Sequence, residues 1–122
     1  MSLKENKAIT HRFVRGWNEG DLEVFDDIFA AEFVYYDPGN PDVHNLVDYK
    51  QFIIDFRAAY PDYHITIEDT IAEGDRVAVH AIGRGTNQQT GKHETLISMN
   101  IVRLVQDRVA EYWCTWIWEN QG

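Results

Sequence analysis

The chain has 122 residues, 44% of them hydrophobic and 13% aromatic, which suits a single domain over residues 1–122 with one core. Eleven basic against twenty acidic residues give a formal net charge of −9, so nucleic acid and other polyanions would be repelled. Charges interrupt every apolar run before the roughly 20 residues that a membrane span needs, and the first residues lack a signal-peptide pattern. We therefore expect a cytoplasmic protein without membrane contact.

Metal and disulfide chemistry finds little support in the sequence. The only cysteine, Cys114, has no second cysteine to pair with or to share a zinc ion. The five histidines are dispersed, and none forms the i, i+4 pair of a helical metal site. We expect neither a metal nor a cofactor.

Two helices are predicted at the start of the chain. Aromatic and aliphatic residues recur every four positions in the first, over Lys4–Asn18, at Ile9, Phe13 and Trp17. Gly20 suits a left-handed residue that ends this helix, and Asp21 suits the N-cap of the next. The apolar side of the second helix is predicted to hold Leu22, Phe25, Ile28 and Phe29.

A short strand and a third helix follow. Phe33–Tyr36 are aromatic or β-branched and predict a strand, and residues 37–41, with two prolines and a glycine, predict a loop. The third helix is expected to begin between Asn45 and Asp48 and to end before Pro61. Its apolar side comprises Tyr49, Phe52, Ile53, Phe56 and Tyr60.

Beyond residue 62 the hydrophobic period changes from helical to alternating. Four strands are predicted, at Tyr63–Ala72, Arg76–Thr86, His93–Val105 and Val109–Trp118. The short connections between them favour sequential antiparallel neighbours. Helices followed by strands form an α+β pattern, in which the helices cover one face of a curved, mainly antiparallel sheet.

The alternation predicts a second apolar face on this sheet. Leu96, Ser98 and Asn100 point to one side of their strand, while Ile97, Met99 and Ile101 point to the other. Trp113 of the last strand belongs to the latter side. Because helices cover only one face, we expect a homodimer in which a second copy covers Ile97, Met99, Ile101 and Trp113.

Asp37 is the candidate general base. It ends an aromatic strand, and surroundings of low polarity make a carboxylate a stronger base. The alternative is a turn residue, because Asp before Pro-Gly often caps a turn with its own side chain. The residues by themselves favour the turn interpretation, and the role as a base stays open as the alternative.

Short motifs over nearly the whole chain resemble the SnoaL-like polyketide cyclase group of the nuclear transport factor 2-like superfamily, which includes ketosteroid isomerase. The motifs are residues 13–22, Tyr36-Asp37-Pro38, Tyr60-Pro61-Asp62, residues 73–77, Gly85-Thr86, Gly91-Lys92 and residues 109–113. The resemblance implies a cone-shaped α+β barrel of three helices and a strongly bent sheet. It also implies a pocket at the open end and a dimer through the sheet.

The ketosteroid isomerase pattern can be placed on this sequence residue by residue. Asp37 falls on the base aspartate, whereas Phe13 occupies the position of the phenol and Asn100 that of the protonated acid. An asparagine can still donate a hydrogen bond to a carbonyl, but a phenylalanine cannot. Many SnoaL-like chains carry an aspartate just after the tryptophan of the last strand, and Cys114 stands there in this chain.

The resemblance also places a substrate pocket around these residues. The residues that we expect to contact the substrate are Phe13, Trp17, Tyr35, His80, Tyr112, Cys114 and Trp116. Each aromatic residue has an ordinary core role as its alternative, and Cys114 can equally be a small buried residue. For His80, a hydrogen-bonded core histidine is favoured over a second acid/base group that faces the cavity.

Two functions are therefore weighed. The first is a cofactor-independent polyketide cyclase or isomerase that transfers a proton next to the carbonyl of a small hydrophobic substrate, with Asp37 as base and Asn100 as polarising donor. The second is a noncatalytic module of the same fold that binds a small ligand or forms a dimeric interaction surface.

Overall fold

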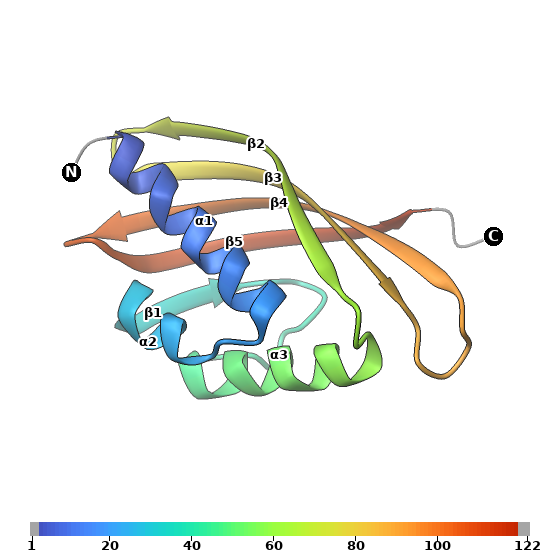
Figure 1. Cartoon of the computed structure of the whole chain (residues 1–122). Helices are drawn as coiled ribbons and strands as arrows, with labels where there is room; N and C mark the ends of the chain where they lie inside the picture. The colour runs from blue at the N-terminus through green and yellow to red at the C-terminus, as the bar shows by residue number, and fades with distance from the viewer. Residues whose placement is uncertain (1–2, 120–122) are drawn as a thin grey trace.

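The computed structural model describes residues 3–119, which form three helices and a five-stranded sheet (Figure 1). The elements are α1 (Leu3–Glu19), α2 (Glu23–Ile28), β1 (Phe29–Tyr36), α3 (Leu46–Ala59), β2 (His64–Glu73), β3 (Arg76–Thr86), β4 (His93–Val105) and β5 (Arg108–Glu119). The helices lie on one side of the sheet, so the expected α+β arrangement is confirmed. No helix within residues 3–119 is both long and apolar enough to cross a membrane.

The junction between α1 and α2 turns at Gly20, whose φ of 67° is the left-handed conformation expected of it. Arg57 of α3 donates to the carbonyl oxygens of Trp17 and Asn18 at 2.6 and 3.2 Å, which satisfies the last turn of α1. The expected cap at Asp21 is wrong. The residue that precedes α2 is Leu22, which makes no side-chain capping bond, and the Asp21 amide donates back to Gly16 at 3.0 Å.

The first strand begins earlier than expected. Phe29 was predicted on the second helix, but α2 ends at Ile28 and Phe29 pairs with Val109 of β5. The pairing is irregular between Phe29 and Val34 and regular from Val34 to Tyr36. A partner from the far end of the chain therefore extends β1 beyond what its local sequence predicts.

The third helix matches its expectation closely. The side chain of Asn45 accepts a hydrogen bond from the Asp48 amide at 2.9 Å and so forms the N-cap. Tyr49 and Ile53 are fully buried on the inner side. The helix ends at Ala59, before Tyr60-Pro61, as the proline predicts.

The strand order in the sheet is β1-β5-β4-β3-β2. Pairing is antiparallel from β2 to β5 and parallel between β1 and β5. Within residues 3–119 the sheet is open, with β1 and β2 at its edges, so the expected closure into a barrel is not found. Asn18 covers part of the β2 edge, because its side chain accepts from the Ile65 amide at 2.7 Å and donates to the Ile65 carbonyl at 2.9 Å.

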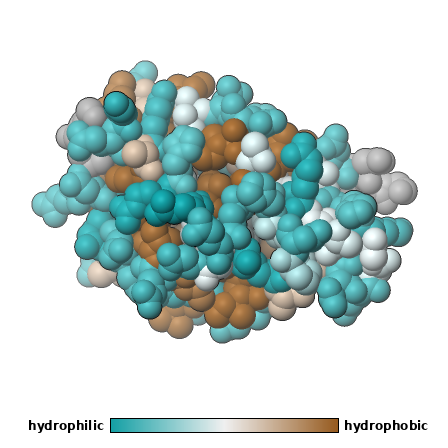
Figure 2. Space-filling view, viewed as in Figure 1, coloured by the Kyte–Doolittle hydropathy of each residue, from teal (hydrophilic) through white to brown (hydrophobic). Residues whose placement is uncertain are grey.

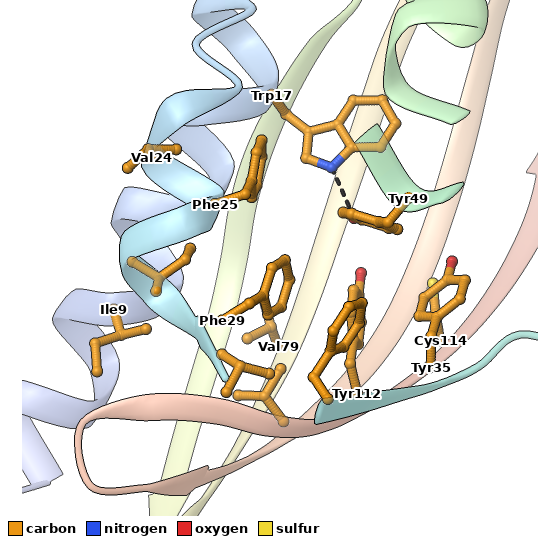
Figure 3. Close-up of a cluster of buried hydrophobic side chains, with 14 of the residues drawn as sticks. Ile9, Trp17, Val24, Phe25, Phe29, Tyr35, Tyr49, Val79, Tyr112 and Cys114 are labelled. Carbon is orange, nitrogen blue, oxygen red and sulfur yellow. Dashed lines mark hydrogen bonds between the residues drawn. The ribbon is translucent and has the colours of Figure 1, made fainter. Parts of the chain in front are cut away.

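The core between helices and sheet is largely aromatic (Figure 3). Trp17 of α1 is 1% exposed and donates its indole N–H to the Tyr49 hydroxyl at 2.9 Å, the bond drawn dashed in Figure 3. Tyr35 and Tyr112 meet edge to face with ring centroids 5.1 Å apart. This packing fixes the inner ends of β1 and β5 against α3 and so positions the residues described below.

The two faces of the sheet differ as the alternation predicted. Leu96, Ser98 and Asn100 are buried under the helices, whereas Met99 and Ile101 on the outer face are 55% and 42% exposed. Seen from the helix side, the surface is mostly hydrophilic with hydrophobic residues showing between polar ones (Figure 2). Met99, Ile101 and Ile117 are exposed on the other face of the sheet, whereas Trp118, also exposed, lies on the helix side against Tyr60.

Candidate functional site

Asp37 begins the turn that follows β1. Its carbonyl oxygen accepts from the Asn40 amide at 3.0 Å, and its side-chain Oδ1 accepts from the Gly39 amide at 3.0 Å. The interpretation of Asp37 as a turn residue is therefore right. A role in the turn alone does not explain why Asp37 is buried, with only 6% of its area exposed.

Three further donors converge on the other carboxylate oxygen of Asp37. Oδ2 accepts from the Tyr35 hydroxyl at 2.7 Å, from the Asn40 side-chain amide at 2.8 Å and from the Trp116 indole at 2.8 Å. With three donors on Oδ2 and one on Oδ1, Oδ1 is the oxygen that keeps more capacity to accept a further proton.

A surface groove opens beside this carboxylate. Its volume is about 470 Å³, and four of its ten lining residues are aromatic. The lining comprises Asp37, Pro38, Gly39, Asn40, Phe52, Phe56, Leu96, Thr115, Trp116 and Trp118. A concave, mainly apolar surface with a few converging polar groups, here Asp37, Asn40 and Thr115, is the usual form of a small-molecule site.

A second, smaller cavity lies deeper between α1 and the sheet. About 40 Å³ is open to a water-sized molecule, which is room for no more than a few waters or one small functional group. Phe13, Trp17, Asn100 and Tyr112, four of the predicted site residues, are among those that line it. Trp116 lines both the groove and this cavity, so the two hollows adjoin at its ring.

Asp37 and Asn100 line different hollows. Asp37 lies in the groove and Asn100 in the cavity, with Trp116 common to both. The Asn100 amide nitrogen donates to the Val79 carbonyl at 3.3 Å and to the Ser98 hydroxyl at 3.0 Å. To donate to a substrate carbonyl, as predicted, Asn100 has to give up one of these partners.

Asn100 is also held through its side-chain oxygen, which accepts from the Tyr112 hydroxyl at 3.0 Å. Burial raises the pKa of Tyr112 well above its usual value, and it also raises the pKa of Tyr35 and of Cys114. These groups stay protonated near neutral pH. Tyr35 reaches the site only through its bond to Asp37, and Cys114, which faces Asn100 across the ladder, is a buried neutral thiol.

His80 lies outside the site. It pairs with Met99 on β4 and lies 3.7 Å from the Asp69 carboxylate, on the outer face of the sheet. Its neighbours Val79 and Ala81, together with Gly83, are the residues of β3 that line the cavity. Both interpretations of His80, as a core histidine and as a cavity-facing group, are therefore wrong, because its side chain lies on the outer face of the sheet and not on the face that the helices cover.

Within residues 3–119, no cluster of three His, Cys, Asp or Glu side chains has a geometry that could hold a metal ion.

Residues 10–112 match the family model of the SnoaL-like domain. The chain belongs to the SnoaL-like family. No curated protein matches this SnoaL-like chain.

Solved structures similar to the SnoaL-like protein include a proposed polyketide cyclase from Acidithiobacillus ferrooxidans. It is 26% identical with a TM-score of 0.82, over 98% of this chain and 92% of that one. AclR, a proposed hydroxylase from Streptomyces galilaeus, is 25% identical with a TM-score of 0.84, over 95% and 91%. IdmH, a proposed polyketide cyclase from Streptomyces antibioticus, is 24% identical with a TM-score of 0.83, over 94% and 92%, and shows the shared fold.

Several residues of the SnoaL-like site escaped prediction. Asn40, Phe52 and Phe56 contribute to the groove, and Tyr63 contributes to the cavity. The sequence does carry a signal for Tyr63, because Gly83 and Gly85 alternate on the neighbouring strand and glycines inside a strand often mark a close approach. A Cβ at Gly83 would lie 1.9 Å from the Tyr63 hydroxyl, so the tyrosine occupies that space.

Proposed function

We propose that this SnoaL-like protein is a cofactor-independent enzyme of the polyketide cyclase or isomerase type, with Asp37 as its base. The observation that supports this most is the oriented carboxylate of Asp37. Three donors fix Oδ2, Oδ1 keeps accepting capacity, and the residue lines an aromatic groove. Such a carboxylate is held in position before the substrate arrives, so no reorientation is required during the reaction.

The proposed step is proton transfer next to a carbonyl. Asp37 takes a proton from the adjacent carbon, the C–H electron pair forms the C=C bond of an enolate, and the carbonyl electron pair moves to oxygen. In an isomerase, Asp37 returns the proton to another carbon of the conjugated system. In an aldol cyclase, the enolate carbon bonds to a second carbonyl carbon, and the resulting alkoxide takes the proton.

The groove suggests the class of substrate. Phe52, Phe56, Trp116 and Trp118 offer flat apolar surfaces, which suit a small, hydrophobic, preferably ring-containing carbonyl compound. The net charge of −9 disfavours an anionic substrate such as a nucleotide. Asn100 remains the predicted polarising donor, subject to the exchange of one of its present partners.

Hydrogen–deuterium exchange tests this proposal without knowledge of the natural substrate. A panel of cyclic aromatic ketones and 1,3-diketones is incubated in D₂O, and loss of the proton signals next to the carbonyl is followed by NMR. We expect the wild-type protein to accelerate exchange of at least one compound, and Asp37→Asn to lower that acceleration about 100-fold or more. Asp42→Asn, in the same loop, is the matched control.

The Asp37→Asn result needs a check of folding. An asparagine directs an N–H₂ group at sites now occupied only by donors, so we expect a loss of stability of about 1–3 kcal/mol. Circular dichroism and thermal unfolding establish that the variant is folded at the assay temperature. Exchange that persists in folded Asp37→Asn would contradict the proposed base.

A noncatalytic binding module is the second candidate. It is favoured by the engaged amide of Asn100, which lines the inner cavity and donates to Val79 and Ser98 instead of pointing at a substrate beside Asp37. Saturable binding of these ketones without any exchange would support it. We further propose that either function is carried by a homodimer that covers the outer sheet face around Met99, Ile101 and Trp113.

A further inference from the structure

The polar groups that line the inner cavity are nearly all engaged within the protein. Thr10, Trp17, Ser98, Asn100, Tyr112 and Trp116 each donate to another protein group. The exception is Tyr63, which lines the cavity with 4% of its area exposed. Its hydroxyl has no hydrogen-bond partner within residues 3–119. Among residues 3–119 the fully buried side-chain atom without a partner is Asn6 Oδ1, so the Tyr63 hydroxyl keeps some surface open to the cavity and is free to donate to a ligand oxygen.

The packing of Tyr63 fixes where this hydroxyl lies. The ring meets Phe56 at a centroid distance of 4.6 Å and Trp17 at 5.9 Å, so it cannot swing freely. The hydroxyl lies over Gly83, where no side chain intervenes. Gly83 pairs with Leu96, which lines the groove. The unengaged hydroxyl is therefore at the part of the cavity that adjoins the groove.

We propose that Tyr63 donates a hydrogen bond to the carbonyl oxygen of a ligand whose hydrophobic body lies in the groove. The choice of a carbonyl as acceptor rests on the proposed function. In that setting Tyr63 supplies the phenol that Phe13 cannot supply, from a strand instead of the first helix. Burial raises the pKa of Tyr63, so the hydroxyl keeps its proton near neutral pH. A neutral donor at this position also stabilises the negative charge that develops on an enolate oxygen.

The test compares a flat ketone with its hydrocarbon counterpart. 1-Tetralone and tetralin are titrated into the wild-type protein, Tyr63→Phe and the control Tyr36→Phe, which removes the same atom from the opposite face of the sheet. Binding is measured by tryptophan fluorescence and calorimetry, and the infrared stretch of the bound carbonyl is recorded. Because Tyr63→Phe keeps the ring, we expect it to fold, which thermal unfolding verifies.

We expect Tyr63→Phe to weaken 1-tetralone binding about three- to tenfold, to leave tetralin binding unchanged and to move the carbonyl stretch to higher frequency. Tyr36→Phe should change none of these. Equal affinities and an unchanged stretch in Tyr63→Phe would overturn the inference, as would the absence of saturable 1-tetralone binding to the wild-type protein. The binding measurements involve no proton transfer. They can therefore support the role of Tyr63 even if the exchange test contradicts Asp37 as the base, and they can fail while the exchange test succeeds.

Discussion

The Trp116 indole donates to Oδ2 of Asp37 over 2.8 Å, although the two residues are 79 positions apart in the chain. The bond joins the last strand to the turn after the first strand. Because Trp116 also lines both hollows, one side chain orients the carboxylate and forms the boundary between groove and cavity. The position of the candidate base therefore depends on an element that the local sequence around Asp37 does not contain.

Trp116→Phe removes this donor while keeping an aromatic ring. We expect the free energy of unfolding to fall by about 1–2 kcal/mol, because a buried bond to a charged group is lost. Ketone exchange should slow as well, since Oδ2 then keeps two of its three donors. Urea unfolding and NMR exchange measure the two effects. The control is Trp118→Phe, since Trp118 stacks on Tyr60 but makes no such bond to Asp37. Equal effects of the two variants would contradict the role of the Trp116 indole N–H.

Gly83→Ala tests the close approach of Tyr63. The new Cβ would lie 1.9 Å from the hydroxyl oxygen and 2.3 Å from Cζ, so the ring must move. We expect a loss of stability of about 1–3 kcal/mol and weaker 1-tetralone binding. Gly39→Ala is the control for stability, because its Cβ would meet only Asp37 Oδ1 at an ordinary 3.5 Å. An unchanged melting temperature in Gly83→Ala would show that Tyr63 lies elsewhere.

Ile101→Lys tests the proposed dimer. Ile101 pairs with Ala78 and Trp113 on the outer sheet face and is 42% exposed, so a lysine there would place a charge inside the proposed interface. We expect light scattering at micromolar concentration to give a dimer for the wild-type chain and a monomer for Ile101→Lys. Val47→Lys, at an exposed position of α3, should stay dimeric. A monomeric wild-type protein would remove the support for the dimer.

Alkaline pH should destabilise the fold. Burial raises the pKa of Tyr35, Tyr49, Tyr63 and Tyr112 above the ordinary 10.0, and that of Cys114 above 9.0. The folded state therefore holds these protons more tightly than the unfolded state. Stability is full below about pH 9 and falls above it, by about 1.4 kcal/mol per pH unit for each group that ionises only on unfolding.

Absorbance at 295 nm and circular dichroism measure this effect together. We expect most phenolate absorbance to appear at the pH at which the circular dichroism signal is lost. Complete tyrosine ionisation in a protein that keeps its native spectrum would contradict the buried positions of these hydroxyls. Alkylation of Cys114 by iodoacetamide should likewise remain slow until the protein unfolds.

The sequence predicts most of this fold because its periodicities are local. The strands Arg76–Thr86 and His93–Val105 have the predicted bounds, since alternation and short turns determine them. The same alternation correctly separates Asn100 from Met99. Alternation does not reveal the parallel pairing of β1 with the distant β5. Because of that pairing, β1 begins at Phe29 instead of Phe33. The open sheet likewise depends on how strands far apart in the chain meet.

The site shows the same division between local and distant determinants. Asp37 is identifiable because it ends an aromatic strand before Pro-Gly, and its capping of the turn is local as well. The donors Trp116 and Asn40, and the unengaged hydroxyl of Tyr63, depend on tertiary contacts. His80 was misplaced because a one-residue error in strand face reverses every side chain. Its true neighbour Asp69 follows an irregularity in β2 that periodicity does not reveal.

The parallel pairing of β1 with β5 has a consequence for synthesis of the chain. During translation Asp37 leaves the ribosome long before Trp116, so for most of that time its strand lacks the neighbour that it has in the folded sheet. Contacts so distant in sequence form late and slow folding. A nascent chain that stops short of Trp116 would contain the carboxylate but not the indole that orients it, so incomplete products should lack the assembled site.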